Sequence, residues 1–174
     1  MMRRMWTLVV VFAAAVLLPA CSSDPTTGYS FASAHDTSIQ TVSVPIFQND
    51  TFHTGVELTL TRDLIKQIQR QTPWRITSSD NADAVLTGSI TKISLRNLST
   101  RSSVGFVQEM AVQMTVEFEF VDNRSGKTLT SRTNYSALGS FVPANPTGER
   151  IDVGYAGVSQ TLAEDLVGDL QTAW

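Results

Sequence analysis

The sequence predicts an α+β fold, a two-layer sandwich in which two helices pack on one face of a mostly antiparallel four- to five-stranded sheet. Two observations carry this prediction. Hydrophobic residues alternate with polar ones through the segment QEMAVQMTVEFEFVD, which has the two-residue period of a strand with one buried face. Two other segments, at residues 54–71 and 152–172, repeat hydrophobic residues every three or four positions, as amphipathic helices do.

The chain begins with the features of a secretory signal peptide. Arg3 and Arg4 precede an uncharged run, WTLVVVFAAAVLL, that is shorter than the about 20 apolar residues needed to span a bilayer. The alternative is a short anchor helix that stays on the protein. The only cysteine, Cys21, follows directly after Leu18-Pro19-Ala20.

This stretch is similar to a bacterial lipobox, although Pro19 stands where a small residue is usual. The similarity implies that residues 1–20 are cleaved off and that Cys21 becomes lipidated. One acyl chain binds a membrane only marginally, so two or three chains on Cys21 would give a firm anchor. The alternative is a buried, inert thiol, but the polar residues after Cys21 offer no core. By resemblance to enterobacterial sorting, Ser22 after the cysteine favours the outer membrane.

Without the signal peptide, the chain has eleven Lys and Arg against 16 Asp and Glu, a net charge of −5. This balance argues against nucleic acid as the main partner. Residues 21–38 comprise the lipidated cysteine and a polar segment of small residues, which we expect to be a flexible tether. Residues 39–174 are then long enough for a single domain with one core.

The domain is predicted to begin with a strand at residues 39–47, in which Val42, Val44 and Ile46 face the core and Pro45 marks an edge or the end of the strand. Thr54-Gly55-Val56-Glu57 has the form of a capping box for a helix that ends near Gln71.

Strands are predicted at residues 74–77 and 84–95, separated by the polar loop SSDNAD. The alternating segment should bury one face, and the turn at residues 122–126 should lead into its hairpin partner, TLTSRTNYSAL. The last helix should bury a stripe of apolar residues: Val158, Leu162, Ala163, Leu166, Val167 and Leu170.

No catalytic or metal-binding pattern stands out. His35 and His53, the only histidines, have no neighbouring ligands at metal-site spacing, and no nucleophile or phosphate-loop motif is present. Glu117 and Glu119 are better explained as a solvated strand face than as an acid–base pair. We therefore expect neither a catalytic activity nor a cofactor.

Basic residues gather in the sheet region, whereas the last 26 residues hold five acids and one Arg. A basic end of the sheet could meet an anion, and ordinary solvated loop charge is the alternative. The basic residues in question are Lys92, Arg96, Arg101, Arg124, Lys127 and Arg132.

The order of several segments resembles the lipopolysaccharide (LPS)-assembly lipoproteins, the LptE-like family. These segments are GYSF, TVSVPIFQNDTFHTGVE, LIKQIQRQTPWRI, ADAVLTGSI, LSTRSSVGFVQEMAVQMTVEFEFVDNRSGKTL and AEDLVGDLQTAW. The resemblance implies a non-enzymatic plug inside an LptD-like outer-membrane β-barrel, which helps the barrel to fold and assists LPS delivery to the outer leaflet. We hypothesise that the cations named above meet phosphates of LPS or acidic residues of the barrel.

A second interpretation stays open. The run from PIFQNDT to ADAVLTGSI is also similar to periplasmic lipoprotein modules that activate penicillin-binding proteins or form curli-secretion subunits. On that interpretation the protein is an adaptor that docks on a peptidoglycan synthase or a secretion pore. The long alternating hairpin favours the translocon.

Overall fold

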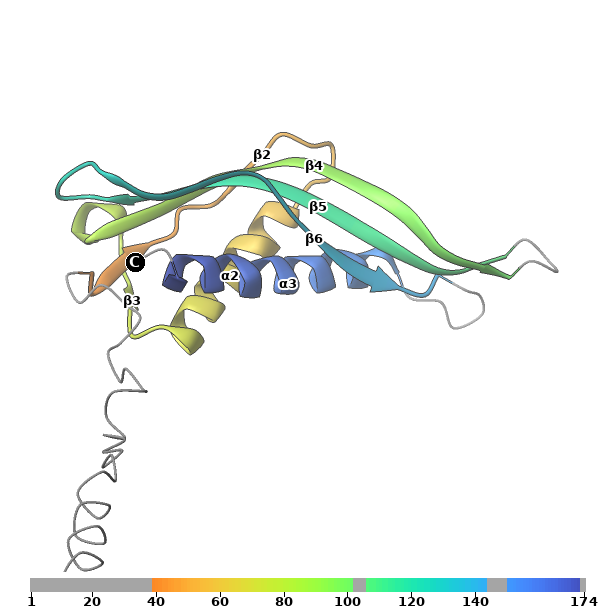
Figure 1. Ribbon diagram of the computed structural model, residues 1–174. Coiled ribbons are helices and arrows are strands. Elements are labelled where there is room, and N and C mark those ends of the chain that lie inside the picture. Colours follow the sequence, from red (N-terminus) through yellow and green to blue (C-terminus); the bar gives the residue numbers. More distant parts are fainter. Residues whose placement is uncertain (1–38, 102–105, 144–149, 173–174) are drawn as a thin grey trace, which may run out of the picture. The chain divides into compact units, whose positions relative to one another are not determined.

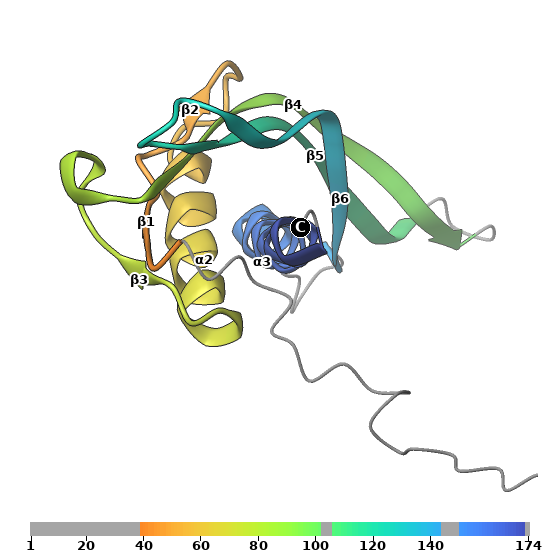
Figure 2. The ribbon, with the colours of Figure 1, turned by 60° about the vertical axis from the view of Figure 1, so that its left-hand side comes forward.

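The computed structural model describes residues 39–101, 106–143 and 150–172, all of which belong to one compact unit, Ala34–Trp174. The two helices, α2 (Val56–Gln71) and α3 (Ile151–Thr172), both lie on the concave side of a curved sheet, as Figures 1 and 2 show. The predicted two-layer α+β sandwich is therefore confirmed.

The sheet has six strands and is mixed. Three long strands, β4 (Ala84–Arg101), β5 (Phe106–Asp122) and β6 (Thr128–Phe141), pair antiparallel. The short strand β1 (Thr41–Ser43) lies parallel between β3 (Arg75–Ile76) and β4. A second short strand, β2 (Gln48–Asn49), also pairs parallel with β4. The prediction of a mostly antiparallel sheet holds for the long strands and misses the parallel pairs.

The first strand is shorter than predicted. It ends at Ser43, which agrees with Pro45 as a strand end, and Ile46 is 63% exposed instead of facing the core. Phe47 takes the core position instead and is only 1% exposed. The chain stops pairing with the sheet after Ser43. Beyond that point the residues are no longer in a strand, so the alternation of polar and apolar residues does not determine which side chain is buried.

The start of α2 confirms one half of the predicted capping box. The carboxylate of Glu57 accepts hydrogen bonds from the Gly55 amide at 3.0 and 3.1 Å. Gly55, with a φ of 88°, is the N-cap residue, and no side chain caps the helix there, so the role predicted for the Thr54 hydroxyl is wrong. A positive φ at this position suits glycine, which has no Cβ to clash.

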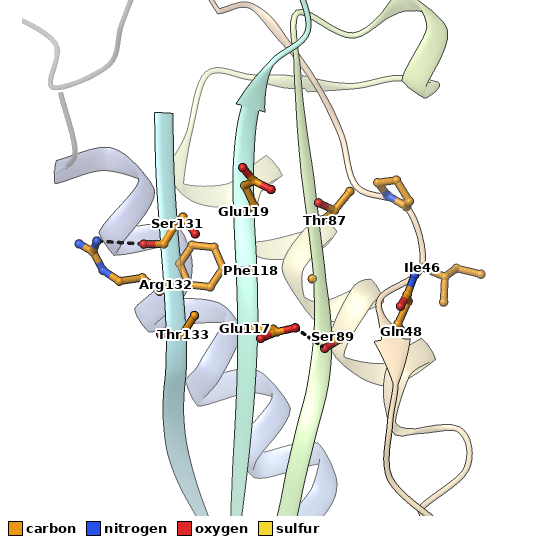
Figure 3. Close-up of a pocket in the computed structure, with 12 residues that line it drawn as sticks. Ile46, Gln48, Thr87, Ser89, Glu117, Phe118, Glu119, Ser131, Arg132 and Thr133 are labelled. Atoms are coloured by element: carbon orange, nitrogen blue, oxygen red, sulfur yellow. Dashed lines mark hydrogen bonds between the residues drawn. The ribbon is translucent and has the colours of Figure 1, made fainter. Parts of the chain in front are cut away.

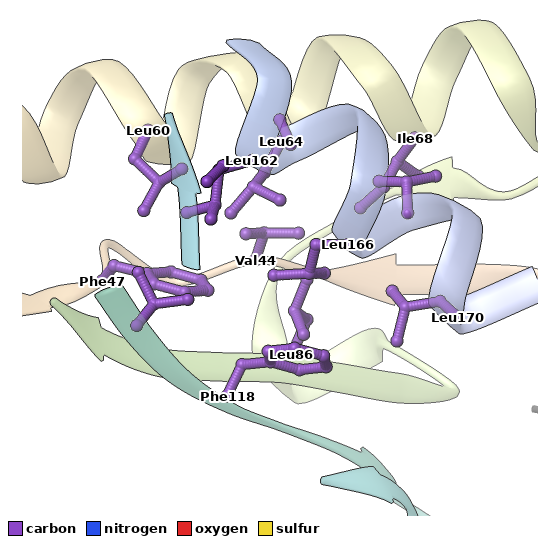
Figure 4. Close-up of a cluster of buried hydrophobic side chains, with 14 of the residues drawn as sticks. Val44, Phe47, Leu60, Leu64, Ile68, Leu86, Phe118, Leu162, Leu166 and Leu170 are labelled. Carbon is purple, nitrogen blue, oxygen red and sulfur yellow. The ribbon is translucent and has the colours of Figure 1, made fainter. Parts of the chain in front are cut away.

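The core lies between the sheet and both helices. The predicted stripe of α3 is buried in full, and the inward residues of β5 from Val112 to Phe120 are at most 3% exposed. Figure 4 shows the side chains of both helices meeting those of the sheet. The members labelled there include Leu60, Leu64 and Ile68 of α2, Leu162, Leu166 and Leu170 of α3, and Phe47, Leu86 and Phe118 below them.

Helix α3 runs close to β6. A Cβ built on Gly139 of β6 would lie 2.3 Å from the Val158 nitrogen, and one on Gly154 would lie 2.8 Å from side-chain carbons of Phe141 and Val112. These glycines weaken the intrinsic helix and strand preferences of their segments. Their small size allows a helix–sheet approach that larger residues would prevent, and this approach fixes α3 under β5 and β6.

Candidate functional site

The face of the sheet that carries no helix is mainly polar, and we call it the outer face. It arises from the strand period, because residues that alternate with buried ones point away from the helices. Its members come from all three long strands: Thr87, Ser89, Lys92, Ser94, Arg96, Gln113, Thr115, Glu117, Glu119, Ser131, Ser136, Leu138 and Ser140.

A groove of about 380 Å³ lies between this face and the segment that enters β2 (Figure 3). Carboxylates and hydroxyls line it: Glu117 accepts a hydrogen bond from the Ser89 hydroxyl at 3.3 Å, and Glu119 accepts one from Thr128 at 2.5 Å. Gly88 forms part of the groove, and the Phe47 ring lies so close that a Cβ on Gly88 would be 2.5 Å from it. The groove therefore offers hydrogen-bonding groups on a rigid sheet, which suits binding.

Among the described residues, no group of three or more His, Cys, Asp or Glu side chains could hold a metal ion. In the same part of the chain, no helix is both long and apolar enough to cross a membrane. Cys21 and the predicted signal peptide and tether lie outside the described residues.

Three of the predicted basic residues belong to β4: two lie on its outer face and the third is its last residue. Lys92 pairs with Thr115 and Arg96 with Ala111, and both basic side chains are exposed. Arg101 is the last residue of β4, and its side chain lies outside what the structure describes. Within the described residues, Lys92, Arg96 and Lys127 take part in none of the ion pairs.

Arg124 has a structural partner. Its guanidinium donates a hydrogen bond to the carboxylate of Asp83 at the turn between β5 and β6. The other oxygen of Asp83 accepts hydrogen bonds from the Gln40 amide at 3.0 Å and from the Thr41 amide and hydroxyl at 2.9 and 2.8 Å. These bonds, that from the Gln40 amide first, hold the pKa of the Asp83 carboxyl far below its ordinary value.

Arg132 is among the residues that line the groove, and its guanidinium has a partner on the helix side of β6. Its register neighbour is the buried Phe118, and its guanidinium lies 3.2 Å from Asp169 of α3. Nearby, Tyr135 meets Phe118 edge to face at 5.6 Å between ring centroids. Burial, reinforced by the charges of Asp169 and Asp165, raises the pKa of Tyr135 to about 12.

The six predicted cations do not form one cluster. The turn that carries Arg124 and Lys127 lies beside Ala84, whereas Arg101 is 17 residues further along β4, up to about 55 Å away at the rise of an extended strand. Basic residues that are near one another in the sequence are thus distributed from end to end of the sheet. Lys92 and Arg96 are the described pair that share the outer face.

Sequence reasoning missed two clusters. One is Asp83 with its partners, which the polar loop SSDNAD did not reveal, because its donors lie about 40 residues away in each direction. The other is the loop between β2 and α2, where the His53 ring nitrogen Nδ1 and the Tyr155 hydroxyl share a hydrogen bond of 2.8 Å. Only a knowledge of tertiary contacts could pair these residues.

Comparison with known proteins decides the family. The family model described as "LptE: Lipopolysaccharide-assembly" matches residues 39–173, most of the chain. The chain belongs to the LptE family. The resemblance predicted from the sequence is therefore confirmed, and LPS assembly is the family-level function of this LptE-family chain.

Two solved structures, those of CT253 and XCC0632, share the fold at low identity. Protein CT253 from Chlamydia trachomatis has a TM-score of 0.51 and 8% identity, over 76% of this chain and 96% of its own. Protein XCC0632 from Xanthomonas campestris has a TM-score of 0.51 and 11% identity, over 78% of this chain and 85% of its own. The rare lipoprotein B from Shewanella oneidensis has a TM-score of 0.46 and 16% identity, over 75% and 92%. No curated protein matches the chain in sequence.

Proposed function

We propose that this LptE-family chain is the lipoprotein component of an outer-membrane LPS translocon. It acts without catalysis, as a plug and assembly partner of an LptD-like β-barrel, and assists insertion of LPS into the outer leaflet. The observation that carries the proposal is the family match over residues 39–173.

The polar outer face supports the plug role. The lumen of a large membrane barrel is lined by polar side chains, and a protein inside it needs hydrogen-bonding groups at its surface. Serine, threonine and glutamate side chains provide such groups over β4, β5 and β6, while the helices and core occupy the other face. A domain with two apolar faces would not suit that environment.

Co-purification tests the proposed partner. The full-length, tagged chain is expressed in its own host, extracted in mild detergent and captured, and the proteins retained are identified by mass spectrometry. We expect the β-barrel LPS-assembly protein of the host in stoichiometric amount. A peptidoglycan synthase or a secretion pore in place of the barrel would contradict the proposal and support the adaptor interpretation.

The lipid anchor is tested separately. We propose that Cys21 carries the acyl chains that hold the protein at the outer membrane. Intact mass spectrometry of the native protein should show a chain that begins at Cys21 with added fatty acids, and Cys21→Ala should abolish this mass shift. An unmodified thiol with residues 1–20 still attached would contradict the anchor.

We also propose that cations on the outer face meet LPS phosphates. Lys92 and Arg96 are the sharpest test, because Arg124 and Arg132 already pair with Asp83 and Asp169. The double variant K92E/R96E should weaken LPS binding at least about tenfold, which corresponds to about 1.4 kcal/mol. Lys127 and Arg101 would be reversed in a second step.

The control makes the same charge change elsewhere. Arg62 and Arg70 are exposed on α2, so R62E/R70E alters the net charge equally but leaves the outer face intact. Binding is measured with the purified full-length protein and fluorescent LPS. Equal loss in both double variants would show a general charge effect and contradict a specific contact at Lys92 and Arg96.

A further inference from the structure

Phe52 is fully exposed, with a relative accessibility of 104%. It lies in the bend between β2 and α2, where the chain leaves the sheet and enters the helix layer. Single exposed aliphatic side chains are common on protein surfaces. A fully exposed phenylalanine presents a large apolar area to solvent, and phenylalanine is among the residues enriched at protein interfaces.

The backbone on both sides of Phe52 is held by one side chain. The Asn49 oxygen Oδ1 accepts hydrogen bonds from the Thr51 amide at 2.9 Å and the Thr51 hydroxyl at 2.7 Å. The Asn49 nitrogen Nδ2 donates to the His53 carbonyl and to the Glu57 carboxylate, each at 2.7 Å. Asn49 therefore uses both ends of its amide to close the loop around Phe52.

The loop is also fastened to the rest of the domain. On the sheet side, the Asp50 amide donates to the Ile90 carbonyl of β4 at 3.0 Å. On the helix side, the His53 ring is hydrogen-bonded to the Tyr155 hydroxyl of α3, and the two ring centroids are 5.6 Å apart. These contacts of Asp50 and His53 hold the backbone on both sides of the exposed Phe52. A group that is ordered before binding loses less conformational entropy when it binds.

The charges of the chain segment that carries Phe52 favour a protein partner over a membrane surface. Between residues 39 and 61 the chain carries Asp50 and Glu57 and no Lys or Arg. Phospholipid and LPS headgroups are anionic, and membrane-surface segments normally carry cations that attract them. The exposed Asp50 beside Phe52 would be repelled there, whereas a basic residue on a protein would complement it.

We propose that Phe52 is an anchor residue that enters an apolar pocket of the β-barrel partner, with a Lys or Arg at the rim of that pocket facing Asp50. Ile46, which is 63% exposed, and Leu58, which is 47% exposed, are the large exposed apolar residues that flank the loop in sequence. This inference rests on the proposed function, because the partner that it names is the barrel of the translocon.

The test uses the full-length lipidated chain co-expressed with the host barrel protein and purified in detergent. The dissociation constant of the complex is measured for the wild type, F52A and L98A. Leu98 is 51% exposed on β4, so L98A removes a comparable exposed apolar side chain from a different place. We expect F52A to raise the dissociation constant at least about tenfold and L98A to change it less than about twofold.

Thermal unfolding separates binding from folding. Because Phe52 packs against nothing in its own domain, F52A should unfold at the same temperature as the wild type. N49A keeps Phe52 but releases the loop, so it should weaken the complex as well, by less than F52A. A complex unaffected by N49A would overturn the part of the inference that concerns the braced loop.

The outcomes distinguish this inference from the proposed function. A wild-type complex that F52A leaves unchanged overturns the anchor role and leaves the proposed function standing. Failure of the wild type to bind the barrel at all overturns both. A photoreactive benzoylphenylalanine at position 52, in complexes reconstituted into lipid vesicles, should crosslink to the barrel protein, and crosslinking to lipid instead would overturn the choice of partner.

Discussion

Gly139 of β6 and Val158 of α3 lie in backbone contact, at a place where even a methyl group would come within 2.3 Å of the Val158 nitrogen. Both partners belong to regular elements, so neither can move aside without disturbing its own hydrogen bonds. This contact holds the longer helix against the edge strand of the sheet, and it requires the absence of a side chain.

Gly139→Ala should destabilise the domain by about 1–3 kcal/mol, the usual cost of extra volume in a packed interior. Gly168→Ala is the matched control in α3, because a Cβ there meets nothing within 4 Å. Alanine favours the helix over glycine, so G168A should stabilise the domain by about 0.5–1 kcal/mol. Denaturant unfolding followed by circular dichroism measures both, and equal shifts in one direction would contradict the close approach.

Asp83→Asn should destabilise the domain by about 2 kcal/mol at neutral pH, because hydrogen bonds from Gln40, Thr41 and Arg124 to a charged carboxylate are lost or weakened. The pKa of Asp83 is lowered by folding, so its ionised form stabilises the domain above the unfolded value near 3.8. The difference between wild type and D83N should therefore shrink as the pH falls below about 4. Unfolding curves between pH 2.5 and 7 measure it, and a constant difference would contradict the linkage.

Ser159→Ala should stabilise the domain by about 0.5–1 kcal/mol. The Ser159 hydroxyl is fully buried in α3 and has no hydrogen-bond partner among the described residues. An unpaired buried polar group costs free energy, and alanine is also the better helix former. Thermal unfolding by calorimetry measures the change, and a lower melting temperature would show that the hydroxyl has a partner.

Asn134→Ala should destabilise the domain by about 1 kcal/mol, whereas Asn134→Gly should be close to neutral. Asn134 has a φ of 56°, a left-handed conformation that asparagine tolerates better than alanine does. It lies in a bulge of β6, where Thr133 and Asn134 together oppose Glu117 of β5. Comparing the denaturation midpoints of the two variants checks this, and equal effects would contradict a backbone cause.

The periodic patterns of the sequence correctly predicted the long strands and helices that bury one face against the core. The alternation around residues 110–120 and the stripe of α3 each set one face against the core, and the structure buries those residues. Strand β4 is longer than predicted. Bulges near Asn97 and Ser99 interrupt the alternation of the sequence, so the prediction stopped at residue 95, but the pairing with β5 continues to Arg101. The parallel pairs of β1 and β2 join distant segments, which no local period records.

The sequence predicted that the candidate site would be a polar face of the sheet, but it did not predict where the charged residues lie on it. The polar face of β5 follows from the alternation of its residues, and so does the exposure of Glu117 and Glu119. The distribution of the cations does not follow, because extended strands separate residues that are close in the sequence. Asp169 and Asp83 pair with two of the cations through contacts that only the tertiary structure creates.

The hydrogen bonds from Gln40 and Thr41 to Asp83 affect how the domain responds to a pulling force. The described domain begins beside Gln40 and Thr41, which Asp83 holds, and β1 is hydrogen-bonded to a strand on each side. A force applied to the chain before residue 39 would act on this part of the domain. The Asp83 carboxylate and the pairings of β1 with β3 and β4 would then share that force. To separate residues 40–43 from the domain, a force would therefore have to break the Asp83 hydrogen bonds and both strand pairings together.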